Sequence, residues 1–174
     1  MKNRVSHAWS ESNAETFSTN PIPESDKDTF RPLLIQVLVT ASSSIRTQFT
    51  AILSKILSSD YPTKWPEFYD VTLNLLQSTQ INEVYAGLTC LHEVSKIYRW
   101  KSGENRSGLQ AIVQNIFPVA LQIANKLVLD SSVESGTMLV LVLKAYKSAI
   151  AVYTCLTRLT GRLNCLQTCK TIPS

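Results

Sequence analysis

The sequence holds few of the side chains that enzymes use for acid–base or metal chemistry. Its two histidines, His7 and His92, lie far apart in a chain of 174 residues. It contains no glycine-rich phosphate loop, no nucleophile elbow and no closely spaced pair of metal ligands. His92 stands beside Glu93 in a helical pattern, where a surface or boundary position is expected more often than a catalytic base. The sequence therefore predicts a protein that is not an enzyme and that needs no cofactor and no metal.

Long apolar runs are missing as well. No stretch approaches the roughly 18 consecutive apolar residues of a membrane-spanning helix, and Met1–Trp9 lacks the apolar core of a secretory signal. Glycine is scarce, with 5 residues, and the chain is 44% hydrophobic and 17% charged. This composition is typical of a folded helical protein rather than a disordered one. We expect no insertion into a membrane.

Basic charge is present but is not clustered. The net charge is +4, and the five basic residues that follow Glu134 account for the excess, because the preceding part of the chain is nearly balanced. A surface that binds nucleic acid would instead show clustered lysine and arginine, often with stacking aromatic side chains. We therefore expect no direct nucleic-acid binding.

The four cysteines are unevenly distributed. Cys90 lies in an apolar helical pattern, which predicts a small buried hydrophobic residue. Cys155, Cys165 and Cys169 lie near the end of the chain, without the tight pairing or nearby histidine of a zinc site. Reduced thiols are favoured over a metal site or a disulfide.

What the sequence does contain is a series of amphipathic helical patterns. Apolar spacing predicts six helices, at about residues 26–40, 45–58, 66–76, 81–100, 109–128 and 133–159. We expect Ser25 to cap the first helix and Pro66 to take the first position of the third. Pro32 should kink the first helix or mark a later start, and Pro118 should bend the fifth. The stripes predicted to be buried in the first two helices are Phe30, Leu33, Leu34, Val37, Leu38, Ile45, Phe49, Ile52, Leu53, Ile56 and Leu57.

Two of these helices share a short sequence. Leu53–Ile56 reads Leu-Ser-Lys-Ile and recurs 41 residues later as Val-Ser-Lys-Ile at Val94–Ile97. Two helices in a period near 40 residues are typical of HEAT-type repeats, and apolar stripes wider than one hairpin can bury favour stacking of neighbouring pairs. The predicted fold is an all-α HEAT-type solenoid of about three helix pairs, a partial array; a compact helical bundle is the alternative.

The predicted organisation has five parts. They are the end of a preceding helix with a loop (1–24), three helical repeats (25–60, 61–101 and 102–160) and an irregular, divergent tail (161–174).

Several segments resemble a known family. Asp60–Pro66 reads Asp-Tyr-Pro-Thr-Lys-Trp-Pro and matches the Asp-Tyr-Pro-x-x-Trp-Pro pattern that importin-beta superfamily receptors often carry between early repeats. Further segments resemble the importin-seven and importin-eight branch in the same order: Lys2–Val5 with Trp9, Ile22–Lys27, Ile45–Arg46, Leu91–Tyr98, and Lys101 with Glu104–Ser107. The resemblance covers residues 2–150.

Two departures accompany this resemblance. The family has further repeats before the segment matched here, so we expect Met1 to fall inside the second repeat and part of the region that grips GTP-loaded Ran to be missing. Past Ala151 the resemblance stops, and we expect residues 151–174 to be an altered end. Without its neighbouring helices, such an array is expected to aggregate readily.

The resemblance implies a non-catalytic nuclear transport receptor of the cytoplasm, nucleus and nuclear pore. Its implied partners are the GTP form of the Ran GTPase, protein cargo and nuclear pore proteins. In this family the second helix of each pair forms the inner face, which makes Gln48, Lys55, Glu93, Lys96 and Trp100 candidate partner contacts. An ordinary solvated face is the other interpretation of these residues. A generic helical-repeat scaffold for a multiprotein complex remains the alternative function.

Overall fold

The computed structural model describes residues 5, 7–10, 20–98 and 107–160. Over these ranges every regular element is a helix and none is a strand, as the sequence predicts. The elements are α3 (Glu24–Thr40), α4 (Ser43–Asp60), α5 (Phe68–Gln77), α6 (Ile81–Tyr98), α7 (Ser107–Ala111), the π-helical η2 (Ile112–Ile116), α8 (Phe117–Leu127) and α9 (Val133–Thr160). Since α7, η2 and α8 follow one another without a break, they form one rod.

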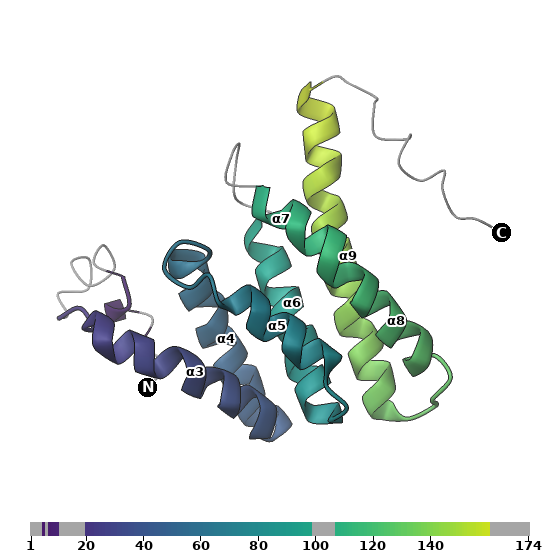
Figure 1. Cartoon of the computed structure of the whole chain (residues 1–174), viewed down its shortest axis with the longest axis horizontal. Coiled ribbons are helices and arrows are strands. Elements are labelled where there is room, and N and C mark those ends of the chain that lie inside the picture. The colour runs from purple at the N-terminus through teal and green to yellow at the C-terminus, as the bar shows by residue number, and fades with distance from the viewer. Residues whose placement is uncertain (1–4, 6, 11–19, 99–106, 161–174) are drawn as a thin grey trace.

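The helices pair in chain order and the pairs stack in a row. α3 packs against α4, α5 against α6, and α8 against α9. The second members also contact one another, α4 with α6 and α6 with α9, while α5 contacts α8. Figure 1 shows the result, with α3 and α9 at opposite ends of the row. The described part of the chain is therefore a partial HEAT-like array, and not a bundle closed around one centre.

The hydrophobic core is deepest along α6, which contacts α3, α4, α5 and α9. Leu88, Leu91 and Tyr98 are completely buried there. Cys90 is also buried, as predicted, and its burial raises the pKa of the thiol to about 12. The side chains of Cys155, Cys165 and Cys169 lie outside the described residues.

Two residues of the apolar stripes predicted for the first two helices are exposed. Leu33 in α3 is 49% exposed and Ile45 in α4 is 50% exposed. Both belong to the first pair of the described array, where only one side has a neighbouring pair, so the periodicity overestimates the buried face. The buried side of α3 instead includes the charged residues Lys27 and Arg31.

Two predicted helix starts are also wrong. α3 begins at Glu24, one residue before Ser25, because the carbonyl of Pro23 already accepts the N–H groups of Asp26 and Lys27 at 3.1 and 3.2 Å. No side-chain cap is used at this start. α5 begins at Phe68, and Pro66 lies in the preceding turn.

The internal prolines are accommodated in different ways. α3 continues through Pro32 to Thr40. Before Pro118 the helix changes from α-helical to π-helical hydrogen bonding in η2, and Pro118 takes a position in the first turn of α8. A proline lacks the N–H group and clashes with the carbonyl four residues earlier, so a π-helical turn at this place relieves both problems.

The close contact between α5 and α6 depends on a glycine. A Cβ atom at Gly87 would lie 3.0 Å from Cγ of Leu76 and 3.1 Å from Cβ of Leu75. These distances are shorter than ordinary van der Waals contacts, so a side chain at this position would force the two helices apart. Gly136 in α9 has nothing within 4 Å of the equivalent point.

Gly87→Ala should therefore destabilise the fold by about 1–3 kcal/mol through overpacking. Gly136→Ala is the matched control, because it adds the same methyl group to a helix in open space and should stabilise by about 0.5–1 kcal/mol through helix propensity. Urea denaturation followed by circular dichroism at 222 nm measures both changes. Equal effects of the two substitutions would show that the α5–α6 contact does not need a glycine.

Candidate functional site

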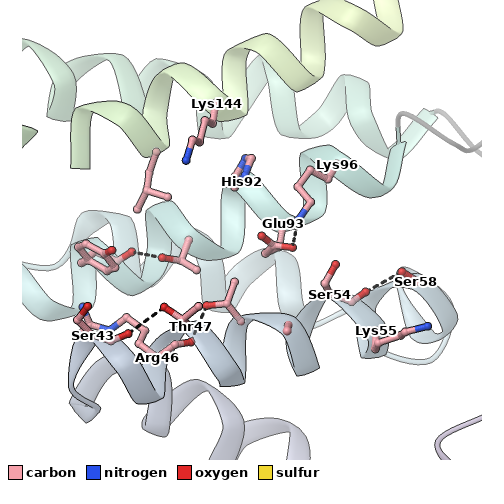
Figure 2. Close-up of a pocket in the computed structure, with 15 residues that line it drawn as sticks. Ser43, Arg46, Thr47, Ser54, Lys55, Ser58, His92, Glu93, Lys96 and Lys144 are labelled. Carbon is pink, nitrogen blue, oxygen red and sulfur yellow. Dashed lines mark hydrogen bonds and ion pairs between the residues drawn. The ribbon is translucent and has the colours of Figure 1, made fainter. Parts of the chain in front are cut away.

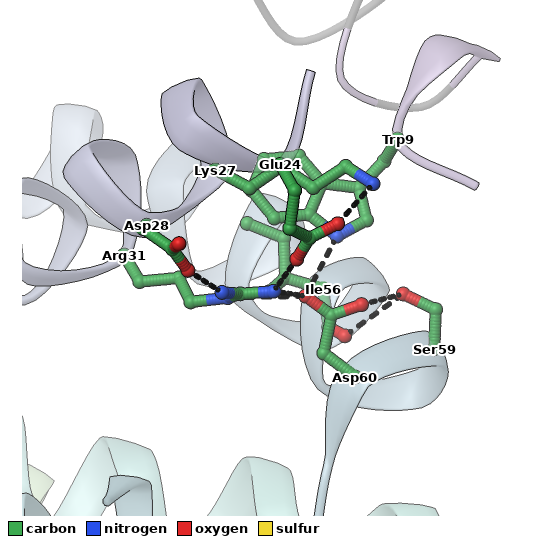
Figure 3. A network of polar contacts seen from close by, with 8 residues as sticks. All are labelled: Trp9, Glu24, Lys27, Asp28, Arg31, Ile56, Ser59 and Asp60. Carbon is green, nitrogen blue, oxygen red and sulfur yellow. Dashed lines mark hydrogen bonds and ion pairs between the residues drawn. The ribbon is translucent and has the colours of Figure 1, made fainter. Parts of the chain in front are cut away.

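The segment Asp60–Pro66 begins at a buried carboxylate where three parts of the chain meet (Figure 3). Asp60, the last residue of α4, is 2% exposed. Its Oδ2 accepts hydrogen bonds from Arg31 of α3, at 3.2 Å from Nε and 2.7 Å from Nη2. The indole Nε1 of Trp9 donates to the same oxygen at 3.0 Å, and the hydroxyl of Ser59 donates to Oδ1 at 2.7 Å. One carboxylate thus joins α3, α4 and the segment around Trp9.

Further charges surround the guanidinium group of Arg31. Glu24 accepts from Arg31 at 2.8 Å, and Asp28 accepts from it as well. The Arg31 hydrogen bond holds the pKa of Glu24 below its ordinary value. Lys27 also pairs with Glu24, at 3.1 Å, and its Nζ lies 5.7 Å from the ring centroid of Trp9. The carboxylates of Glu24 and Asp28 compensate the positive charge that is buried on Arg31.

The aromatic residues of the same segment form a joint towards the next pair. The Tyr61 ring lies edge-on to Phe68 at 5.8 Å and to Tyr98 at 6.2 Å, and the Trp65 ring lies 4.9 Å from Phe68. The carbonyl of Asp60 accepts the N–H of Lys64 at 2.7 Å, which closes the turn. Asp60–Pro66 is therefore a structural connection between helix pairs, and its three buried side chains, Asp60, Tyr61 and Trp65, are committed within the chain.

A different surface, the groove between the second helices, is lined by polar side chains (Figure 2). It has a volume of about 640 Å³ and lies between α4, α6 and α9. Its charged lining consists of Arg46, Lys55, Lys96 and Lys144 against the single carboxylate of Glu93.

The structure brings three of the five candidate contacts into this groove. Lys55, Glu93 and Lys96 line it. Gln48 is exposed on α4 but does not line the groove, and Trp100 lies outside the described residues. Glu93 is 3% exposed and its carboxylate accepts a hydrogen bond from Lys96 at 2.6 Å, so its observed contact is with its own chain. A role of these residues in partner binding remains a prediction.

Sequence reasoning missed Arg46 and Lys144 as groove residues. Nε of Arg46 donates to the carbonyl of Leu38 at 2.9 Å, near the end of α3, and its Cζ lies 4.4 Å from the ring centroid of Tyr85. A cation is favourable beside the carbonyls at a helix C-terminus, and Arg46 is fixed by this contact. Lys144 reaches the groove from α9, and no local pattern near residue 144 reveals that neighbourhood.

His92 also lines the groove. Burial lowers its pKa; Glu93 raises it in opposition, and Lys96 and Lys144 lower it further. The imidazole is therefore neutral at neutral pH, and within the described part of the chain its buried Nδ1 has no hydrogen-bond partner. Among these same residues, no cluster of histidine, cysteine and carboxylate side chains is arranged to hold a metal ion.

Several hydroxyl groups of α4 line the groove. Thr47, Thr50 and Ser58 each donate to the backbone carbonyl four residues earlier, at 3.0, 2.9 and 2.7 Å. A hydroxyl that donates its proton in this way keeps acceptor capacity on its oxygen. The groove thus combines cationic donors with a row of hydroxyl oxygens, an arrangement suited to binding and without a nucleophile–base pair.

Several known proteins are similar to this chain over most of its length. No family model matches it. It is 32% identical over 161 residues to Nonsense-mediated mRNA decay protein 5 of Saccharomyces cerevisiae, which covers 84% of this chain and 15% of that protein. It is 28% identical over 153 residues to Importin-8 of Danio rerio, and the match covers 86% of this chain and 15% of that protein. It is 31% identical over 152 residues to the Importin beta-like SAD2 homolog of Arabidopsis thaliana, and the match covers 86% of this chain and 14% of that protein. The chain spans about 15% of the length of these curated relatives.

No helix among the described residues is long and apolar enough to cross a membrane.

Asp60→Ala should destabilise the fold by about 3 kcal/mol, because it leaves the buried guanidinium of Arg31 and the indole N–H of Trp9 without their shared acceptor. Asp70→Ala is the control: Asp70 is exposed on α5, and its loss should change stability by about 0.5 kcal/mol or less. The measurement is the midpoint of urea denaturation. If the midpoint is unchanged in Asp60→Ala, the buried carboxylate does not hold these segments together.

Proposed function

The chain belongs to the importin-beta family, and from this membership we propose that it forms part of a nuclear transport receptor that binds protein cargo and Ran-GTP. Its partners are the Ran GTPase in the GTP form, protein cargo and nuclear pore proteins. Its place of action is the cytoplasm, the nucleus and the nuclear pore.

The groove between α4, α6 and α9 is the observation that supports this proposal most directly. It gathers polar and charged side chains from three successive pairs on one surface. Of these side chains, Arg46, Glu93 and Lys96 already make hydrogen bonds within the chain. Such a surface can bind a macromolecule over several repeats at once. Lys55 and Lys96 are the side chains we propose for partner contact, with Glu93 positioning Lys96.

The physical work proposed here is binding and shape change rather than catalysis. Each pair contacts the next one along the row, so small changes at each contact add up over an array. The relatives named as importins are transport proteins and not enzymes.

Retention of Ran tests this proposal. Joined to the N-terminal repeats of the Saccharomyces cerevisiae relative and immobilised, the 174-residue chain should retain Ran loaded with a non-hydrolysable GTP analogue in clear excess over Ran-GDP, because a receptor must distinguish the two states to release its cargo on one side of the nuclear envelope. The complete Saccharomyces cerevisiae relative serves as the comparator.

The comparator defines what a negative result means. If it discriminates between the two forms of Ran and the fusion retains both equally, or neither, the proposed Ran binding is wrong. The circular dichroism spectrum of the immobilised protein's stock must show a helical fold in either case.

A further inference from the structure

The groove carries more positive charge than the chain itself neutralises. Four cationic side chains line it, and its one carboxylate, Glu93, is buried and bonded to Lys96. Arg46 is held by backbone carbonyls, which leave its charge uncompensated. The remaining cations, Lys55 and Lys144, are both exposed, and neither has an ion-pair partner among the described residues.

The repeat in the sequence explains why Lys55 and Lys96 differ. The two lysines are 41 residues apart, and each is followed by an isoleucine in the shared motif. The residue three positions before Lys96 is Glu93, whereas the residue three positions before Lys55 is Ile52, which is buried in the core. Lys96 therefore has an internal carboxylate partner at i−3, and Lys55 does not.

We propose that this groove binds an acidic segment of a protein partner in an extended conformation. This inference rests on the proposed function, because it names the chemistry of a partner at the same surface. The cations stand on three different helices, α4, α6 and α9, and Figure 2 shows Lys144 on the opposite wall from α4. A single phosphate-sized anion could not contact them all, whereas a chain with several carboxylates can.

The dimensions and the hydroxyl groups fit an extended peptide. From Ser43 to Ser58, which both line the groove, α4 rises by roughly 22 Å, the length of about seven residues of extended chain. The oxygens of Thr47, Thr50 and Ser58 can accept hydrogen bonds from peptide N–H groups, since their own protons are donated to α4. The carboxylates of the bound peptide would pair with the lysines of the groove, and the peptide's backbone N–H groups would donate to the groove's hydroxyl oxygens.

Nucleic acid fits this groove less well. Proteins that bind single strands combine basic charge with aromatic faces on which bases stack. Tyr85 is the aromatic residue in the groove lining, and the guanidinium of Arg46 already lies over its ring at 4.4 Å. The groove thus offers charge without an open stacking face.

The inference is tested by fluorescence polarisation with the 174-residue chain and a labelled ten-residue peptide that contains six Asp or Glu residues. Binding should weaken as NaCl rises from 50 to 200 mM. The double variant Lys55→Glu/Lys144→Glu should lose about tenfold or more in affinity, because both walls then repel the peptide. Lys126→Glu/Lys64→Glu is the matched control, since both lysines are exposed outside the groove and the net charge changes equally; it should bind within about twofold of the unchanged chain.

Further probes separate the alternatives. A lysine-rich peptide of the same length should bind the Lys55→Glu/Lys144→Glu variant and not the unchanged chain. Equal losses in the groove and control variants, or tighter binding of a ten-nucleotide single-stranded RNA than of the acidic peptide, would overturn the inference. If the glutamate variants lose their helical circular dichroism, Lys55→Gln/Lys144→Gln replaces them and should still weaken binding several-fold.

The two proposals can fail separately. GTP-dependent retention of Ran without binding of the acidic peptide would refute the groove's acidic ligand and leave the transport function standing. Peptide binding without any discrimination between Ran-GTP and Ran-GDP would support the groove and refute the proposed Ran contact.

Discussion

The buried ion pair between Arg31 and Asp60 is the constraint on which the first half of the array depends. It joins α3 to the end of α4, and through the indole of Trp9 it also fixes the segment that precedes α3. A buried pair of this kind adds little net stability compared with well-packed apolar residues, since desolvation offsets much of the attraction. Its effect is geometric: removing either partner leaves a charge in the core, so only one arrangement of these segments is tolerated.

The segment that begins at Asp60 positions the α5–α6 pair against the α3–α4 pair. The turn closed by the Asp60 carbonyl directs Tyr61 against Phe68 and Tyr98 and Trp65 against Phe68. α5 then packs closely on α6 at Gly87. α6 in turn contacts both α4 and α9. The groove exists because these contacts hold three second helices side by side, so the buried polar joint and the exposed polar groove are consequences of one packing scheme.

The all-α repeat architecture was predictable because the spacing of apolar residues and a repeated sequence motif both indicate it. Apolar spacing located six helical rods, and the motif shared by Leu53–Ile56 and Val94–Ile97 indicated stacked pairs. Burial at the first pair was not predictable in the same way. Leu33 and Ile45 continue the apolar period but are half exposed, while Arg31 is buried because a carboxylate 29 residues away in sequence receives it. Periodicity reports on a helix alone, whereas burial depends on its neighbours.

The candidate site shows the same division. Lys55 and Lys96 could be found from sequence because the repeat places them on equivalent faces of α4 and α6, and the structure puts both in one groove. Lys144 could not, since α9 does not carry the motif and its approach depends on the α6–α9 packing. Glu93 reads as a surface acid in the sequence, yet it is buried with Lys96 bonded to it. A helical repeat thus copies positions along the array, but the charge that each position presents is decided by a few neighbours: Glu93 before Lys96 neutralises one copy, and Ile52 before Lys55 leaves the other copy charged.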